Sequence, residues 1–195
     1  DDVRMSFAST FTQTVPEIEW KENKLIELGG KEWIYFEFKS NTADTDINND
    51  LNNDTGLDME ITENFSGDNP NGMITGDNSG VFPDNVIRSS WWIDFGLKSQ
   101  LRISGLNQNW AYTFVFFGSR NGGGDRTSVY TINGQSVSLN ASFNISETVQ
   151  IDQVRPDENG EVFIDISLGQ YAQYAYLGAM VIHGYQVTDG DGSSS

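Results

Sequence analysis

The feature that most constrains the fold of this chain is the recurrence of short runs in which apolar and polar residues alternate, while no long window shows a helical period. In the clearest run, 161–168, aliphatic residues at the even positions alternate with polar residues and Phe163. Turn signals separate the runs, among them Asn133-Gly134, a pair that favours a tight β-hairpin. The strands predicted in this way cover residues 3–11, 31–40, 88–94, 101–106, 110–120, 127–132, 136–139, 148–154, 161–168 and 176–187.

A succession of short strands with Gly, Asn and Pro turns predicts an all-β fold, an antiparallel β-sandwich. The 195 residues suffice for one such domain with a sizeable core, without cysteine and therefore without disulfides. We expect a single β-sandwich over residues 1–188 and a flexible linker stub over 189–195, DGDGSSS. The stub, the start at two aspartates and the lack of a signal peptide are typical of a module cut from a larger secreted or cell-surface protein.

The charge of the chain argues against two classes of partner. Its 11 Lys and Arg stand against 28 Asp and Glu, which gives a net charge of −17. Phosphate binding needs a basic surface, so we expect neither nucleic acid nor an anionic membrane as partner. No apolar run is long enough to cross a bilayer. Two interpretations of the charge stay open: bound divalent cations that relieve the repulsion, or simple solubility of an extracellular protein.

Two adjacent tryptophans stand in the run RSSWWID at 88–94. Neighbouring side chains of an extended chain point to opposite faces, so Trp91 and Trp92 cannot both be core residues. Trp91 shares its face with the apolar residues at 87, 93 and 95, and Trp92 shares its face with Arg88, Ser90 and Asp94. An indole flanked by charged groups suits the face of a sugar ring. Either Trp92 binds a sugar, or it lies under a loop.

A glycine-rich loop, GSRNGGGDRT at 118–127, places Arg120 and Arg126 on either side of Asp125. It is not a P-loop, because it lacks Gly-Lys-Ser/Thr and no helix is expected to follow. The two arginines either form structural ion pairs with Asp125 or present their guanidinium groups to sugar hydroxyls or carboxylates.

Three tyrosines lie just before the last predicted strand or at its first residue, at 171, 174 and 176, and combine stacking area with a hydroxyl group. At least one of them is expected to belong to the core, as are most of the tryptophans at 20, 33 and 110. The predicted ligand-binding residues are Trp92, Arg88, Asp94, Arg120, Arg126, Tyr171 and Tyr174.

Oxygen-bearing side chains at alternate positions, Asp44, Asp46, Asn48 and Asp50, resemble the first half of a calcium loop. The pattern fails as an EF-hand, because position 49 is Asn instead of Gly and position 55 is Thr instead of Glu. Either these four residues bind a structural Ca²⁺, or 41–56 is a solvated polar loop.

Catalysis is not expected. The single histidine, His183, cannot provide a catalytic triad or a His-rich metal centre in a chain without cysteine, and we expect it to be a hydrogen-bonded strand residue. A glycosidase or lyase that uses two carboxylates remains an alternative, because many acidic residues are present and their separation in space does not follow from the sequence.

Four runs resemble a recurrent module of secreted bacterial proteins: SSWWIDFG at 89–96, LRISGLNQNWAYTFVFFGSR at 101–120, GDRTSVYTING at 124–134 and YLGAMVI at 176–182. The module belongs to the galactose-binding-domain-like jelly rolls, often found in polysaccharide-degrading Bacteroidetes, and the resemblance covers 56–187. It implies a jelly-roll β-sandwich that acts as a non-catalytic carbohydrate-binding module, frequently with a structural Ca²⁺. It implies neither a particular sugar nor particular binding residues.

Three hypotheses for the function follow. The first is a monomeric glycan-binding module that targets a larger secreted enzyme or surface protein to a polysaccharide. The second is a structural or adhesin spacer domain without a glycan ligand, and the third is the carboxylate-dependent glycosidase or lyase. Because a net charge of −17 repels polyanions, neutral glycans are the expected ligands of the first.

Overall fold

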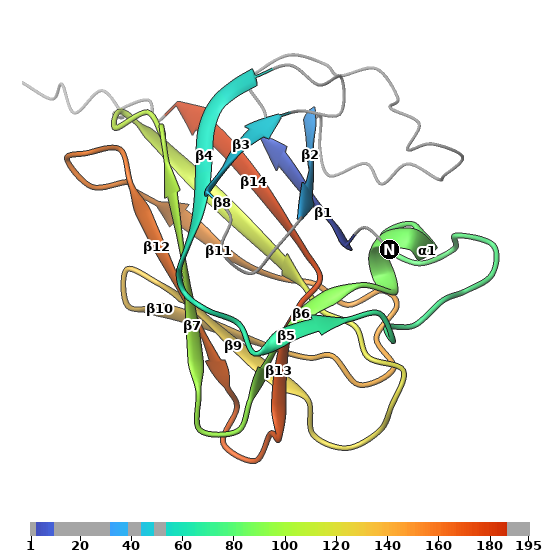
Figure 1. Cartoon of the computed structure of the whole chain (residues 1–195). Coiled ribbons are helices and arrows are strands. Elements are labelled where there is room, and N and C mark those ends of the chain that lie inside the picture. The colour runs from blue at the N-terminus through green and yellow to red at the C-terminus, as the bar shows by residue number, and fades with distance from the viewer. Residues whose placement is uncertain (1–2, 10–31, 39–43, 49–53, 187–195) are drawn as a thin grey trace, which may run out of the picture.

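The molecule is an antiparallel β-sandwich (Figure 1). The structure, a computed structural model, describes residues 3–9, 32–38, 44–48 and 54–186. Every pairing between its strands is antiparallel. The all-β sandwich predicted from the sequence is therefore confirmed.

One layer is a six-stranded sheet with the order β10-β9-β12-β7-β4-β3. The other layer contains the three-stranded sheet β11-β8-β14, and the β1-β2 pair lies beside β14. The strands of the first layer are β3 (Asp44–Asn48), β4 (Asp54–Glu63), β7 (Lys98–Ser104), β9 (Thr127–Ile132), β10 (Gln135–Asn140) and β12 (Val162–Leu168). Those of the second are β1 (Val3–Ser9), β2 (Glu32–Phe38), β8 (Trp110–Phe117), β11 (Val149–Val154) and β14 (Ala179–Gln186). From β7 to β14 the chain crosses repeatedly between the layers, as is typical of a jelly roll.

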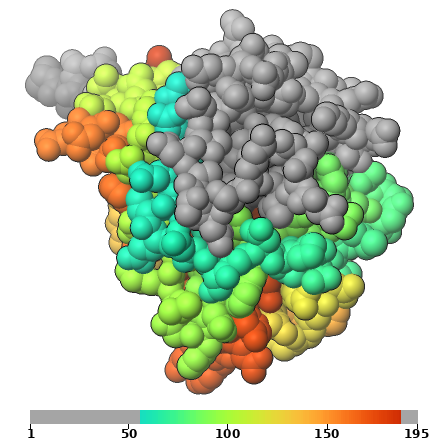
Figure 2. Space-filling view, in the orientation of Figure 1, coloured from blue at the N-terminus to red at the C-terminus, as the bar shows by residue number. Residues whose placement is uncertain are grey.

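A third, smaller sheet contacts the six-stranded sheet through β13 and β6, and we call it the site sheet. It has the order β13-β6-β5 and consists of β5 (Gly67–Asn69), β6 (Ser90–Asp94) and β13 (Tyr174–Leu177). The single helix of the described residues, α1 (Asp84–Ile87), lies just before β6. In the space-filling view, atoms from the cyan, green, yellow and red parts of the chain form one continuous lower surface (Figure 2). The site sheet itself combines three segments that are far apart in the sequence, 67–69, 90–94 and 174–177.

The main hydrophobic core lies between the two layers. On β12, Ile164 and Ile166 are fully buried, whereas Phe163 on the other face is 41% exposed, which confirms the predicted alternation. The hairpin predicted at Asn133-Gly134 joins β9 to β10, and both residues have the positive φ angles that a two-residue turn requires.

The central strand β8 is buried on both faces, as its uninterrupted apolar sequence predicts. Phe114 and Phe116 face the main core, while Phe117 faces a second, smaller cluster covered by α1 and Phe82. The rings of Phe82 and Phe117 meet edge to face, with centroids 5.2 Å apart. This second cluster fixes the segment 72–88 against the sandwich, and that segment contributes to the site described below.

Two expectations from the sequence are wrong. Residues 44–48 are not part of a polar loop, because they form β3, which pairs with β4 in the six-stranded sheet. Phe95 is not a core residue beside Trp91 but is 77% exposed, because β6 ends at Asp94 and the chain turns there.

Trp110 belongs to the core, as the sequence predicts. His183 is half-buried within β14, which agrees with the strand position expected for it. Position 20 and the stub predicted at 189–195 lie outside the described residues, as do the side chains of β1 to β3. Within the described ranges, no helix has the length and apolar character needed to span a bilayer.

Candidate functional site

The two faces of the site sheet have different compositions. Trp91 and Ile93 on β6 point into the main core, and Trp91 is only 1% exposed. Trp92 between them is half-buried and lies on the opposite face, directly across from Tyr176 of β13 and Gly67 of β5. Alternation along β6 therefore assigns one tryptophan to the core and the other to the outer face.

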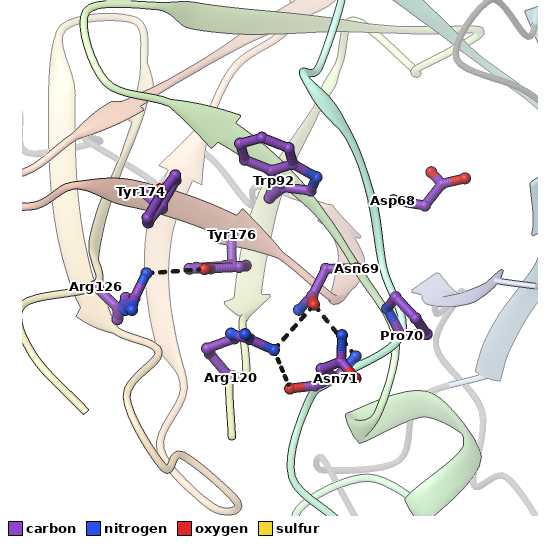
Figure 3. Close-up of a pocket in the computed structure, with 9 residues that line it drawn as sticks. All are labelled: Asp68, Asn69, Pro70, Asn71, Trp92, Arg120, Arg126, Tyr174 and Tyr176. Carbon is purple, nitrogen blue, oxygen red and sulfur yellow. Dashed lines mark hydrogen bonds between the residues drawn. The ribbon is translucent and has the colours of Figure 1, made fainter. Parts of the chain in front are cut away.

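The outer face of the site sheet forms one wall of a pocket of about 370 Å³, which we call the first pocket. Figure 3 shows its lining: Arg126 extends from a loop toward Tyr174 and Tyr176, and Arg120 extends from the same loop toward Asn69 and Asn71. The lining residues are Asp68, Asn69, Pro70, Asn71, Trp92, Arg120, Arg126, Tyr174 and Tyr176. A pocket of this size with aromatic walls and a few fixed polar groups has the usual features of a small-ligand site.

Arg120 is held in place by the Gly-Ser-Arg sequence that follows β8. A Cβ at Gly118 would lie 2.9 Å from the Tyr176 carbonyl oxygen, so only glycine lets the chain pass this close to β13. The buried Ser119 hydroxyl donates to the Asn144 carbonyl at 2.6 Å and accepts from the Met73 amide at 3.0 Å. Together these contacts fix the backbone from which the Arg120 side chain extends.

The Arg120 guanidinium is positioned by two asparagines. Its Nη1 donates to the Asn69 side-chain oxygen at 3.3 Å and to the Asn71 carbonyl at 3.0 Å (Figure 3). The Asn69 amide in turn donates to the Ser90 hydroxyl at 3.2 Å, which accounts for the burial of Ser90 on the face of Trp92. A guanidinium with fixed partners loses little side-chain entropy when it binds a ligand.

Arg126 lies on the other side of the pocket. Its Cζ is 4.9 Å from the centroid of the Tyr174 ring, a cation–π distance. Its Nε donates to the Gly123 carbonyl and its Nη1 donates to the Tyr176 hydroxyl, each at 3.3 Å. The structural ion pair with Asp125 is absent: among the described residues, no carboxylate lies within 4.0 Å of Arg120 or Arg126.

Trp92 meets Tyr174 edge to face, with ring centroids 5.5 Å apart. On its other side the indole lies over Gly67, where an added Cβ would be 3.1 Å from Nε1. The absence of a side chain at Gly67 therefore leaves room for the indole on the site sheet. Trp92 is half-buried and lines an open pocket, so part of the ring is accessible to a ligand.

A second pocket, of about 500 Å³, adjoins the first and shares Pro70, Asn71 and Arg120 with it. Its further lining residues are Gly72, Ile74, Arg88 and Asn121. The Gly72 amide donates to the Arg88 carbonyl at 2.8 Å, and the Asn121 amide donates to the Asn71 carbonyl at 2.9 Å. The two pockets thus share a boundary formed by Pro70, Asn71 and Arg120.

Asp84 anchors the loop that follows Ile74, a lining residue of the second pocket. Its carboxylate accepts hydrogen bonds from the Thr75 amide and hydroxyl at 2.7 and 2.8 Å and from the Gly76 amide at 2.7 Å. Partial burial raises the pKa of this carboxyl, but the hydrogen bonds from Thr75 and Gly76 lower it by more, so the pKa lies below its usual value. The loop is therefore most stable when Asp84 is ionised.

The structure places two of the predicted ligand-binding residues outside both pockets. Asp94 ends β6, and its side chain accepts a hydrogen bond from the Phe95 amide at 2.8 Å, so it caps a turn. Tyr171 is 77% exposed in the loop between β12 and β13. Trp92, Arg120, Arg126 and Tyr174 share the first pocket, and Arg88 lines the second.

Sequence reasoning missed Asn69, Asn71 and Tyr176. The segment Ser66 to Gly72 has the composition of a turn, which gives no sign that the Asn69 side-chain oxygen and the Asn71 carbonyl accept hydrogen bonds from an arginine about fifty residues later. Tyr176 was treated with the other tyrosines, and it is the buried one of the set.

Three of the four residues predicted to bind calcium, Asp44, Asp46 and Asn48, lie in the strand β3. Asp50 lies outside the described residues. Within the described ranges, no group of three or more acidic or histidine residues is arranged to hold a metal ion. The calcium site stays a prediction from the sequence.

No protein-family model matches the chain, and no curated protein matches its sequence. Among solved structures, a GH29 fucosidase from Ruminococcus gnavus in complex with fucose is similar over 69% of this chain, with 13% identity and a TM-score of 0.34. The chain spans 26% of that fucosidase. A CBM32 domain of Clostridium perfringens, in complex with GalNAc-β-1,3-galactose, is similar over 66% of this chain and 95% of its own, with 9% identity and a TM-score of 0.33.

Proposed function

We propose that this protein is a non-catalytic glycan-binding module and that the first pocket is its sugar site. The observation that carries the proposal is the convergence of an accessible indole with two fixed guanidinium groups and two asparagines in one open pocket. Pyranose rings offer an apolar face for stacking and hydroxyl pairs for directional hydrogen bonds, and this pocket provides a partner for both. Trp92 and Tyr174 supply the apolar contact, and Arg120 and Arg126 supply the polar ones.

The affinity expected of such a site is modest, roughly micromolar to millimolar, because a shallow sugar site displaces ordered water and buries little apolar area. A module of this kind acts by keeping an attached enzyme or surface protein near a polysaccharide, which raises its effective concentration there. The proposal therefore includes an extracellular location and a larger parent protein.

The carboxylates of the site support binding over hydrolysis. A glycosidase of the common type needs two carboxyl groups on either side of the scissile bond. Among the described residues that line the two pockets, Asp68 alone carries a carboxylate, and Figure 3 shows it directed away from the arginines. For the spacer hypothesis, the expected arrangement is Trp92 covered by a loop, and here the residue lines an open pocket.

The test is a glycan array carrying neutral and acidic oligosaccharides, probed with the wild type and two matched variants. Trp92→Ala removes the aromatic wall, and binding is expected to fall at least about tenfold. Tyr171→Ala removes an exposed aromatic residue outside both pockets, so its binding should equal that of the wild type. A folded wild type that binds nothing on the array overturns the proposal. Equal losses of glycan binding in Trp92→Ala and Tyr171→Ala would show that the sugar site is not the first pocket.

Running the array in Ca²⁺ and in EGTA tests the calcium prediction at the same time. A structural ion at 44–50 should raise the melting temperature in Ca²⁺, because a ligand that binds only the folded state stabilises it. Identical melting curves in Ca²⁺ and EGTA would remove calcium from the description of this module.

A further inference from the structure

Of the five arginines in residues 54–186, Arg102 forms ion pairs with described carboxylates, whereas Arg88, Arg120, Arg126 and Arg155 form none. Arg102 on β7 forms ion pairs with Glu60 and Glu161, as expected for a cation in a strongly acidic protein. Arg88 and Arg120 in the second pocket have no carboxylate within 4.0 Å among the described residues, although the chain carries 28 acidic residues. No described carboxylate therefore neutralises the arginines of the two pockets through an ion pair.

Part of the Arg120 guanidinium is free to bind a ligand. A guanidinium carries five N–H groups, and the two of Nη1 are used by Asn69 and Asn71. Within residues 54–186, Nε and Nη2 have no hydrogen-bond partner, and the side chain borders both pockets. The free N–H groups match the two oxygens of a carboxylate or sulfate group in a bidentate pair.

We infer that the glycan bound by this module is anionic, and that its carboxylate or sulfate group lies in the second pocket between Arg88 and Arg120. This inference rests on the proposed function and changes the ligand class expected from net charge alone. The first pocket holds one sugar ring on Trp92, and the second pocket holds the acidic substituent or the next acidic sugar. The ligand is therefore an oligosaccharide of at least two units or a single ring with an extended acidic group.

The net charge of −17 does not contradict an anionic ligand. At physiological salt the Debye length is about 8 Å, so the distant carboxylates are screened while a contact with Arg88 or Arg120 is not. The global charge acts mainly on the rate of association, and the local pair decides which ligand stays bound. Added salt therefore has two opposite effects: it weakens the local contact and also reduces the long-range repulsion.

The experiment measures binding by calorimetry to three oligosaccharide probes of matched length: a neutral galacto-oligosaccharide, an oligogalacturonate and a sulfated galacto-oligosaccharide. The variants are Arg88→Gln and, as a control with the same change in charge, Arg155→Gln. Arg155 is exposed and lines neither pocket, so the control reproduces any general effect of net charge. Arg88 is also exposed, so its replacement is not expected to affect folding.

The expected result is that one anionic probe binds at least about tenfold more tightly than the neutral probe, and that Arg88→Gln removes most of this difference. Arg155→Gln should keep the difference. Which of the two anionic probes binds distinguishes a carboxylate from a sulfate. Equal binding of neutral and anionic probes overturns the inference but keeps the glycan-binding function. A folded protein that binds none of the probes and no glycan on the array overturns both.

Discussion

The two faces of the site sheet differ in what determines the surroundings of their side chains. On the inner face, Trp91 and Ile93 pack into a core whose neighbours come from both layers of the sandwich. On the outer face, Trp92 and Tyr174 meet polar side chains from the loops after β5 and β8. The inner face follows from alternation along a single strand, whereas the outer face depends on where distant loops end. Stability and binding should therefore separate between adjacent residues.

The largest effect that tests this comparison is expected at Trp91. Trp91→Ala should lower the free energy of unfolding by about 3–5 kcal/mol, because it empties an aromatic position in the main core. Trp92→Ala should change this free energy by less than about 1 kcal/mol, since the side chain is only half-buried. Chemical denaturation of both variants measures the difference, and the reverse order would show that the two faces have been assigned the wrong way round.

The next effect concerns the loop beside the second pocket. The folded-state pKa of Asp84 is lowered, so its ionised form contributes stability that is present above the unfolded pKa and is lost as the pH falls through the folded pKa. Asp84→Asn should cost about 1–2 kcal/mol at pH 6, after allowance for solvent screening of a partly exposed group.

As the pH falls through the lowered folded-state pKa, the wild-type carboxyl becomes protonated, and the difference between the two proteins should shrink toward zero. Urea denaturation at pH 6 and over a series of acidic pH values measures this difference. A difference that is the same at pH 6 and at low pH would mean that the charge of Asp84 has no part in holding the loop.

A smaller effect is expected at Arg126, and it concerns binding alone. Lysine keeps the charge but loses the planar group over Tyr174 and the donor to the Gly123 carbonyl. Arg126→Lys should weaken binding of the best glycan on the array about fivefold, or about 1 kcal/mol, with an unchanged melting temperature. Full affinity in this variant would show that a point charge at this position is sufficient.

The smallest effect is expected at Gly67. Gly67→Ala brings a methyl group to within 3.1 Å of the Trp92 indole nitrogen, so the ring must shift by a few tenths of an ångström. A change in affinity of about twofold to threefold with little loss of stability is expected, because the indole lies at the open pocket. Tryptophan fluorescence of the variant with and without glycan measures the shift. An unchanged spectrum together with an unchanged affinity would show that the Trp92 indole does not contact the ligand.

Much of the fold could be predicted from the sequence. The alternation in β12, the apolar sequence of β8 and the turn at Asn133-Gly134 each depend on contacts that are close along the chain or on one buried face. The error at 44–48 arose because Asp and Asn are rare in strands, and pairing with β4 overrode that local preference. The core position expected for Phe95 failed because the length of β6 depends on its partners in the site sheet.

The sequence by itself determined the sandwich, the opposite faces of Trp91 and Trp92 and the acidic character of the chain, because these follow from composition and from a period of two residues. Only the tertiary structure decided which of these residues share a pocket. Asn69 and Arg120 are fifty-one positions apart and meet through a hydrogen bond. Whether an arginine is paired with a carboxylate or free to bind a ligand depends on distances across the fold, and no pattern along the chain contains them.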